Sequence, residues 1–274
     1  MNSLQTRRVA LPVALALLAA TGFVSALSVP SAHAAGQTLD LNLGFGANYD
    51  DNLLQYSSRQ RDDFKVGAHP VRYSIQSLDD VTMDPTLGLA WTINQGHGRR
   101  HVLRARFTGD FQGTNHTRDY HEVSAGWREV FPHGRSLSLG FYSLPGYYLR
   151  QLTAEDYTPP GGVTRYKRAQ FDLSIGSAAW DQAINQRTDL ELAYQLEHRG
   201  YVPDFKERTS DTHQGKVSLQ FSGKRPATDV TLIGGYRVSK AKAKDGDEVG
   251  GVADDEDVSY KGPILGLDGR YEFS

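Results

Sequence analysis

The sequence predicts an all-β fold, a transmembrane antiparallel up-and-down β-barrel of about ten strands. Three observations predict it. Apolar and polar residues alternate along most of the chain after residue 38, so each strand has one apolar and one polar side. The alternating runs extend over about 10 to 15 residues, whereas a tilted strand needs about 9–11 to cross a bilayer. Short and long connections also alternate between the runs. Twelve strands and a truncated larger barrel are the alternatives.

The composition excludes several other classes of protein. The 274 residues include no cysteine, so disulfide frameworks and thiolate metal sites are excluded. The 30 basic and 32 acidic residues nearly balance, so nucleic acid is not an expected partner. A mean hydropathy of -0.49 is too low for a bundle of membrane-spanning helices.

The N-terminal segment is predicted to be a secretory signal peptide over residues 1–34. Arg7 and Arg8 precede an apolar run from Val9 to Leu27, and Ala32-His33-Ala34 has the small-x-small pattern of a cleavage site. A retained membrane anchor is the alternative. With cleavage after Ala34, residues 35–274 form the barrel domain outside the cytoplasm of a bacterium.

The first five predicted strands each have a period-two apolar side. These sides consist of Leu39, Leu41, Leu43, Phe45, Ala47 and Tyr49; Leu87, Leu89, Trp91 and Ile93; Leu103, Ala105, Phe107, Gly109 and Phe111; Val123, Ala125 and Trp127; and Leu137, Leu139 and Phe141. In the last five strands the apolar sides are Ala169, Phe171, Leu173 and Ile175; Leu190, Leu192, Tyr194 and Leu196; Val217, Leu219 and Phe221; Val230, Leu232 and Tyr236; and Leu265, Leu267, Tyr271 and Phe273.

The connections between these strands alternate in length. Short ones are predicted near 96–99, 132–135, 181–187 and 223–227. Longer ones are predicted near 50–80, 151–164, 201–211 and 241–258, and 112–118 is intermediate. The sheet should close on itself, because an open edge in lipid would leave backbone N–H and C=O groups unpaired.

The C-terminal end, Arg270-Tyr271-Glu272-Phe273, is similar to the recognition strand of Gram-negative outer-membrane β-barrel proteins, which carries aromatic-x-aromatic and usually ends on Phe. The resemblance covers residues 36–274. It implies a location in the bacterial outer membrane, contact with outer-membrane lipid and lipopolysaccharide, and insertion by the barrel-assembly machinery. Ser274 departs from the pattern: one trailing residue is tolerated, or the chain is truncated. Tyr49-Asp50-Asp51-Asn52 also resembles the first-strand ends of barrel porins associated with exopolysaccharide export.

The polar sides of the strands are predicted to form a charged lumen. Eight acidic and nine basic residues share this register: Asp40, Asp110, Glu122, Asp172, Glu191, Glu197, Asp268 and Glu272 with Arg104, Arg106, Arg128, Arg150, Arg168, Arg199, Lys216, Arg237 and Arg270. Because ten strands enclose a narrow interior, a balanced set should form Arg–carboxylate pairs across a constricted lumen.

Aromatic residues near the strand ends are predicted to form girdles at the lipid boundaries, with ordinary packing as the alternative. These residues are Trp91, Trp127, Tyr147, Trp180, Tyr194, Tyr236, Tyr271 and Phe273.

Catalytic and metal sites have little support in the sequence. Asp211-Thr212-His213 is similar to the Asp–His pair of omptin proteases, and Asp119-Tyr120-His121 repeats its spacing. Their parity, however, points these side chains away from the lumen, and the paired aspartates of omptins are missing from residues 112–118. The last long connection contains weak candidates for Ca²⁺ or Mg²⁺ ligands, Asp245, Asp247, Asp254 and Asp255. The alternative is that these residues belong to a solvated loop without a bound cation.

The expected function is porin-like or export-associated passage of solutes through the lumen, with no enzyme activity and no cofactor. A surface structural or binding barrel that acts through its outer loops is the alternative. A hydrolase of omptin type at the outer rim is a second alternative.

Overall fold

The computed structural model describes residues 36–52, 57–67, 75–153, 166–223, 228–241 and 259–271. The predicted signal peptide, Phe273 and the acidic residues Asp245, Asp247, Asp254 and Asp255 lie outside the described residues. All the strands described below belong to one compact unit, Gln37–Ser274.

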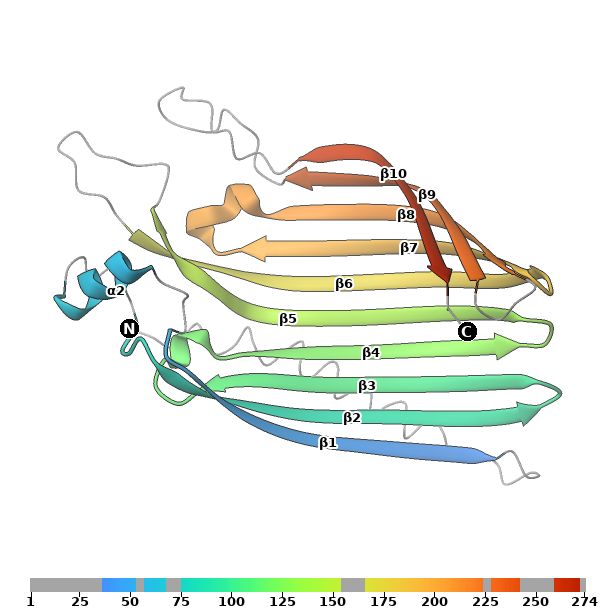
Figure 1. Ribbon diagram of the computed structural model, residues 1–274, viewed down its shortest axis with the longest axis horizontal. Coiled ribbons are helices and arrows are strands. Elements are labelled where there is room, and N and C mark those ends of the chain that lie inside the picture. Colours follow the sequence, from blue (N-terminus) through green and yellow to red (C-terminus); the bar gives the residue numbers. More distant parts are fainter. Residues whose placement is uncertain are drawn as a thin grey trace. The chain divides into compact units, whose positions relative to one another are not determined.

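The structure is all-β and forms one antiparallel sheet in which each strand pairs with its neighbours in sequence (Figure 1). This confirms the predicted up-and-down order and strand number. The strands are β1 (Gln37–Asp50), β2 (Asp80–Gly96), β3 (Arg99–Gln112), β4 (Tyr120–Phe131), β5 (Arg135–Thr153), β6 (Tyr166–Asn185), β7 (Thr188–Tyr201), β8 (Ser210–Ser222), β9 (Thr228–Ala241) and β10 (Tyr260–Tyr271).

The sheet is open at its two edges. Among the described residues, β1 pairs with β2 alone and β10 pairs with β9 alone, so the predicted ring closure is not present. Figure 1 shows β1 and β10 at opposite edges of the sheet. Leu43 on β1 is 80% exposed and Leu265 on β10 is 85% exposed, because neither strand has a second neighbour to cover its side chains.

The connections agree with the prediction, and the strands are as long as predicted except β2, β5 and β6, which contain 17, 19 and 20 residues. The strands contain 12 to 20 residues, and tight turns follow β2 and β4 at the predicted positions. Gly96, His97 and Gly98 all have positive φ in the first turn, and His133 and Gly134 do in the second. Glycine enters this region without a Cβ clash, which explains its use at these tight turns.

Three short helices lie in the described parts of the longer connections. Helix α2 (Ser58–Lys65) follows β1 and begins with a capping box, in which Ser57 and Gln60 satisfy each other's backbone N–H groups. The 3-10 helices η1 (His116–Arg118) and η2 (Pro203–Arg208) connect β3 to β4 and β7 to β8. The described part of the first long connection, near 50–80, contains α2.

Residues directly opposite each other in paired strands share one face of the sheet, so the pairing register assigns every strand residue to a face. One face contains Leu89, Ala105, Ala125 and Phe141 in a single hydrogen-bonded row and is called the apolar face. The other contains Arg106, Ser124, Tyr142 and Glu197 and is called the polar face.

The register corrects the predicted faces of β6. Ile175 pairs with Glu197 and Phe171 pairs with Tyr201, so Phe171, Leu173 and Ile175 lie on the polar face rather than the apolar one. Trp180 pairs with Leu192 on the apolar face, as predicted. A strand of period two cannot place both Ile175 and Trp180 on one side, because their numbers differ in parity.

Candidate functional site: the two faces of the sheet

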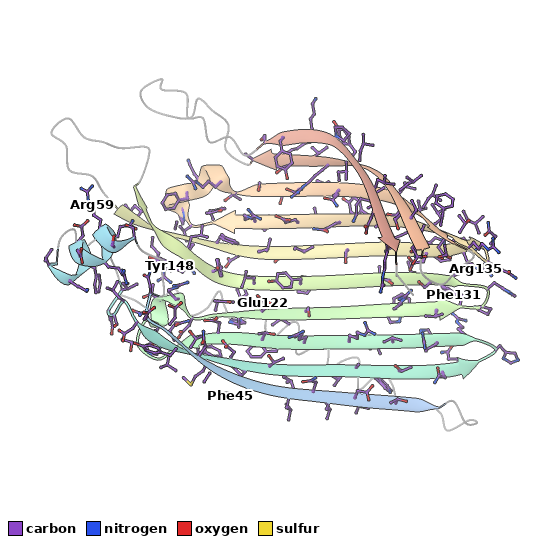
Figure 2. The ribbon with its side chains drawn as sticks, in the orientation of Figure 1. Phe45, Arg59, Glu122, Phe131, Arg135 and Tyr148 are labelled. Carbon is purple, nitrogen blue, oxygen red and sulfur yellow. The ribbon has the colours of Figure 1, made fainter. Side chains whose placement is uncertain are left out.

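The apolar face exposes large aliphatic and aromatic side chains on β1, β2, β5, β7, β8, β9 and β10, whereas those on β3 and β4 are half-buried. Leu87, Leu139, Leu192 and Leu232 are each between 45% and 48% exposed, although they belong to four different strands inside the sheet. Phe45 projects from the edge strand β1 (Figure 2) and is 72% exposed. Exposed apolar surfaces that extend over several strands mark sites of contact with another protein or with a membrane.

Five of the predicted girdle residues lie on the apolar face: Trp91, Trp127, Trp180, Tyr194 and Tyr236. All three tryptophans of the chain are within five residues of the short-turn end of their strands, β2, β4 and β6. Trp127 stacks on His101 with 6.1 Å between ring centroids, and Trp180 contacts Phe131 at 5.9 Å. Tryptophan therefore gathers at one edge of the apolar face.

Tyr147 does not belong with this group. It pairs with Phe171, so it lies on the polar face, and a β-bulge between Leu144 and Tyr147 accounts for the shift in parity. The backbone of Tyr271 pairs with Thr228 at the end of β10; its side chain and Phe273 lie outside the described residues.

The polar face gathers most of the predicted lumen charges. By register and alternation they are Asp40, Arg104, Arg106, Asp110, Glu122, Arg128, Glu191, Glu197, Arg199, Lys216, Arg237, Asp268 and Arg270. The side chain of Arg150 and the residue Glu272 lie outside the described part of the chain. Two of the predicted residues lie elsewhere. Asp172 pairs with Gly200, next to His198 on the apolar face, and Arg168 shares its parity, so both belong to the opposite face. The physical reason is the reversed parity of β6 described above.

Charges on the polar face interact within the wall of the sheet. The guanidinium of Arg199 donates to Glu197 at 2.9 Å, and Arg237 approaches the same carboxylate at 4.0 Å. Arg128 donates to Ser136 at 3.0 Å, and the Ser136 hydroxyl donates to Asp181 at 2.5 Å. These contacts join polar side chains on the same strand or on strands that lie close together in the sheet. None of them reaches across to a distant part of the sheet.

Arg104 and Arg106 differ from those arginines. They lie on β3 beside Gly88 and Ala90 of β2 and Ser124 and Gly126 of β4. No ion pair joins either of them to another residue in the part of the chain that the structure describes, and both are exposed. Two positive charges therefore project from a patch of small, uncharged residues on the polar face.

A chain of aromatic rings crosses the polar face near the long connections. Tyr120, Tyr147, Phe171 and Tyr201 come from β4, β5, β6 and β7, with successive ring centroids 5.1, 5.5 and 5.3 Å apart. Arg199 lies over Phe171, 5.4 Å from its centroid. Phe171 is only 9% exposed. The apolar side chains of β6 are thus covered by aromatic neighbours on an otherwise polar face.

Sequence reasoning missed this aromatic chain because it assigned Phe171 to the other face. One sequence signal could have revealed it. The apolar residues of this strand have odd numbers over 171–175, whereas Trp180 has an even number and must lie on the other face. Tyr120 and Tyr142 add polar groups beside the rings, since their hydroxyls bond to Asp110 and Glu122. Figure 2 labels Glu122, the residue on β4 to which Tyr142 bonds.

A buried polar cluster fixes the long-connection end of β2 and β3. Asn115 is 2% exposed and Asp80 is 4% exposed. The carboxylate of Asp80 accepts the backbone N–H groups of Thr114 and Asn115 at 3.0 and 2.7 Å. The amide oxygen of Asn115 accepts the N–H of Gln76 at 2.7 Å. Beside this cluster, hydroxyl groups of Ser77 and Tyr49 donate to Asp79 and lower the pKa of its carboxyl group.

The aspartates of the two protease-like pairs contact other histidines, since Asp119 lies 3.2 Å from Nδ1 of His116 and Asp211 contacts His198. Asp211 binds Nδ1 of His198 at 2.6 Å, whereas His213 contacts the hydroxyl of Tyr194, also at 2.6 Å. Asp119 accepts the backbone N–H of Gln112. His121 stacks on Phe107 at 6.0 Å on the apolar face. His121 and His213 lie on the apolar face, the direction that their parity predicted.

The described residues contain no cluster of three or more acidic or histidine side chains suited to a metal ion. None of the helices in the described ranges is both long and apolar enough to cross a membrane. Comparisons with known protein families, curated proteins and solved structures found no match to the chain.

Proposed function

We propose that the chain is an integral β-barrel of the bacterial outer membrane that provides porin-like or export-associated passage through a charge-lined lumen. One observation carries the proposal: an exposed apolar face runs across the sheet, and a charged face lies directly behind it. In lipid this arrangement needs no covering partner, because hydrocarbon solvates the apolar face and the polar face encloses water. In water, so large an apolar surface would favour aggregation.

The proposal includes closure of the sheet by pairing of β1 with β10. Free N–H and C=O groups at an edge are tolerated in water but cost several kcal/mol each in hydrocarbon. The tryptophans at the short-turn edge also support insertion into a membrane, since tryptophan favours the membrane–water interface. The short-turn side is then the periplasmic side, and α2, η1 and η2 lie on the outer side.

The decisive test is migration on a denaturing gel with and without heating, using membranes that contain the full chain. A closed barrel resists detergent at room temperature, so we expect a compact, faster band that shifts on heating. Identical migration of the two samples, or recovery of the chain in a soluble fraction, would contradict the proposal.

Passage itself is tested by recording from the purified protein in planar bilayers. A lumen narrowed by the aromatic chain Tyr120–Tyr147–Phe171–Tyr201 should give steps well below those of large porins, which have sixteen or more strands. A conductance typical of such porins would contradict the narrow lumen.

The same aromatic chain favours a second candidate, a surface barrel that conducts nothing and acts through its outer loops. It places four packed rings across neighbouring strands at the long-connection end. Absence of any conductance step, in a protein that passes the heating test, would select this candidate over passage.

A further inference from the structure

The free edges of β1 and β10 are compatible in strand direction, in strand length and in the side on which their apolar residues lie. Because the sheet has an even number of antiparallel strands, β1 and β10 run in opposite directions. They contain 14 and 12 residues. We infer that the two strands pair in one particular register, which places Ala47 opposite Leu267. This inference rests on the proposed function, in which the sheet closes into a barrel.

The register follows from a row of paired residues that crosses the whole sheet. Starting at Asn42 on β1, the row passes through Gly88, Arg106, Ser124, Tyr142, Ile175, Glu197, Thr212 and Ser239 and reaches Tyr260 on β10. The row meets no bulge. In a closed barrel it does not return to its starting residue, because tilted strands are staggered.

The stagger sets the strand tilt. With a rise of about 3.3 Å per residue and a strand spacing of about 4.8 Å, a stagger of about 12 residues over ten strands tilts them by about 40°. Transmembrane barrels have tilts of about 35–45°, and staggers of about 10 and about 14 residues fall at the two limits of that range. An odd stagger would bring apolar residues against charged ones.

The direction of the stagger follows from the extent of β10. A shift of about 12 residues from Tyr260 toward the C-terminus places Asn42 beside position 272, directly after the end of β10. The opposite shift places Asn42 beside position 248, before β10 begins, and would leave both edges unpaired. The first choice therefore pairs residues 43–50 with 264–271.

The resulting neighbours are complementary in size, which is independent support. Glycines of one strand face larger residues of the other: Gly44 faces Arg270, Gly46 faces Asp268, Gly266 faces Asn48 and Gly269 faces Phe45. An aromatic ring opposite a strand glycine covers the gap that the glycine leaves. A register two residues shorter would instead set Gly46 against Gly266, with no side chain to cover either backbone.

The absence of cysteine from the chain makes the register directly testable. Ala47→Cys is combined in turn with Leu265→Cys, Leu267→Cys and Gly269→Cys, and membranes holding each full-length variant are treated with a mild oxidant. We expect the Ala47→Cys, Leu267→Cys pair to form an intramolecular disulfide at least tenfold faster than the other two pairs. A disulfide needs Cα atoms about 4.4–6.8 Å apart, which diagonal neighbours exceed.

Each other outcome overturns the inference in a distinguishable way. Faster cross-linking at 265 or 269 contradicts the register but leaves the barrel intact. Disulfide-linked dimers as the main product show that β1 pairs with a second copy. No cross-linking in any pair, when each variant still shows the heat-dependent gel shift, excludes β1–β10 pairing near Ala47. Absence of the gel shift in the cysteine-free chain itself contradicts the proposed function, and the inferred register, which rests on it, then fails as well. Ala47→Cys alone is the control for intermolecular disulfides.

Discussion

At the scale of single residues, Asn115 joins the segment before β2 to the connection between β3 and β4. Its side chain accepts the N–H of Gln76 and donates to Ser77 O and Asp80 at 3.0 and 2.8 Å. Asn115→Ala should lower the free energy of unfolding by about 2–3 kcal/mol, since the partners stay buried without a replacement. The measurement is denaturant unfolding in detergent followed by tryptophan fluorescence. Thr114→Ala is the matched control, because Thr114 contributes a backbone N–H that the substitution keeps.

The exposed charges of Arg104 and Arg106 should bias passage toward anions. A unit charge about 8 Å from an ion in water changes the energy of that ion by about 0.5 kcal/mol, or about twofold in local concentration. Each arginine raises the local concentration of anions and lowers that of cations, so replacing both with glutamine should lower the anion-to-cation permeability ratio by about sixteenfold, measured as a reversal potential under a salt gradient. Arg135→Gln removes the same charge from the opposite face and should leave the ratio unchanged. An unaltered ratio in the double variant would show that Arg104 and Arg106 do not line the passage.

At the scale of elements, the bulge in β5 determines how the aromatic chain forms. Gly146 has a φ of 66°, and a Cβ there would lie 2.8 Å from Nε2 of Gln170. Its N–H donates to Asp172 at 2.6 Å. Gly146→Ala should destabilise the protein by about 1–2 kcal/mol through left-handed backbone strain. Gly176→Ala on the adjacent strand, with open space at its Cβ, should change stability by less than half as much. Equal thermal midpoints for the two variants would contradict this reason for the glycine.

The three tryptophans report the position of β2, β4 and β6 in a bilayer. All lie near the short-turn ends on the apolar face. Lipids that carry a quencher near the headgroup should reduce their fluorescence more than lipids labelled at the chain end. Stronger quenching from the bilayer centre would show that the strands sit at a different depth or that the apolar face contacts protein instead.

Period-two alternation was sufficient to predict most elements. It identified ten strands, their order, the faces of eight strands and those of β5 before its bulge, because apolar and polar residues alternate there without interruption. It failed where the rule of one apolar side was broken locally. Phe171, Leu173 and Ile175 lie on the polar face because Tyr147 and Tyr201 pack against Phe171, and only the pairing register reveals that packing. The capping box of α2, Ser57 to Gln60, was readable in the sequence and was not used.

At the scale of the whole molecule, alternation cannot predict which edges meet. Every observed strand pair joins sequence neighbours, so each register depends on a local turn or connection. Pairing of β1 with β10 has no connecting segment to fix it. It depends instead on the sum of nine registers and on the strand tilt, which are properties of the complete sheet.

The order of the sheet also has a kinetic consequence. Nine hairpin-like contacts form between segments adjacent in the chain, and such local contacts form quickly because little chain entropy is lost in each. The pairing of residues 43–50 with 264–271 would span nearly the whole chain and so would form last. Until it forms, two strand edges remain available to other chains. Closure of the sheet then competes kinetically with aggregation. The yield of closed protein should depend on how quickly an insertion factor occupies one of the edges.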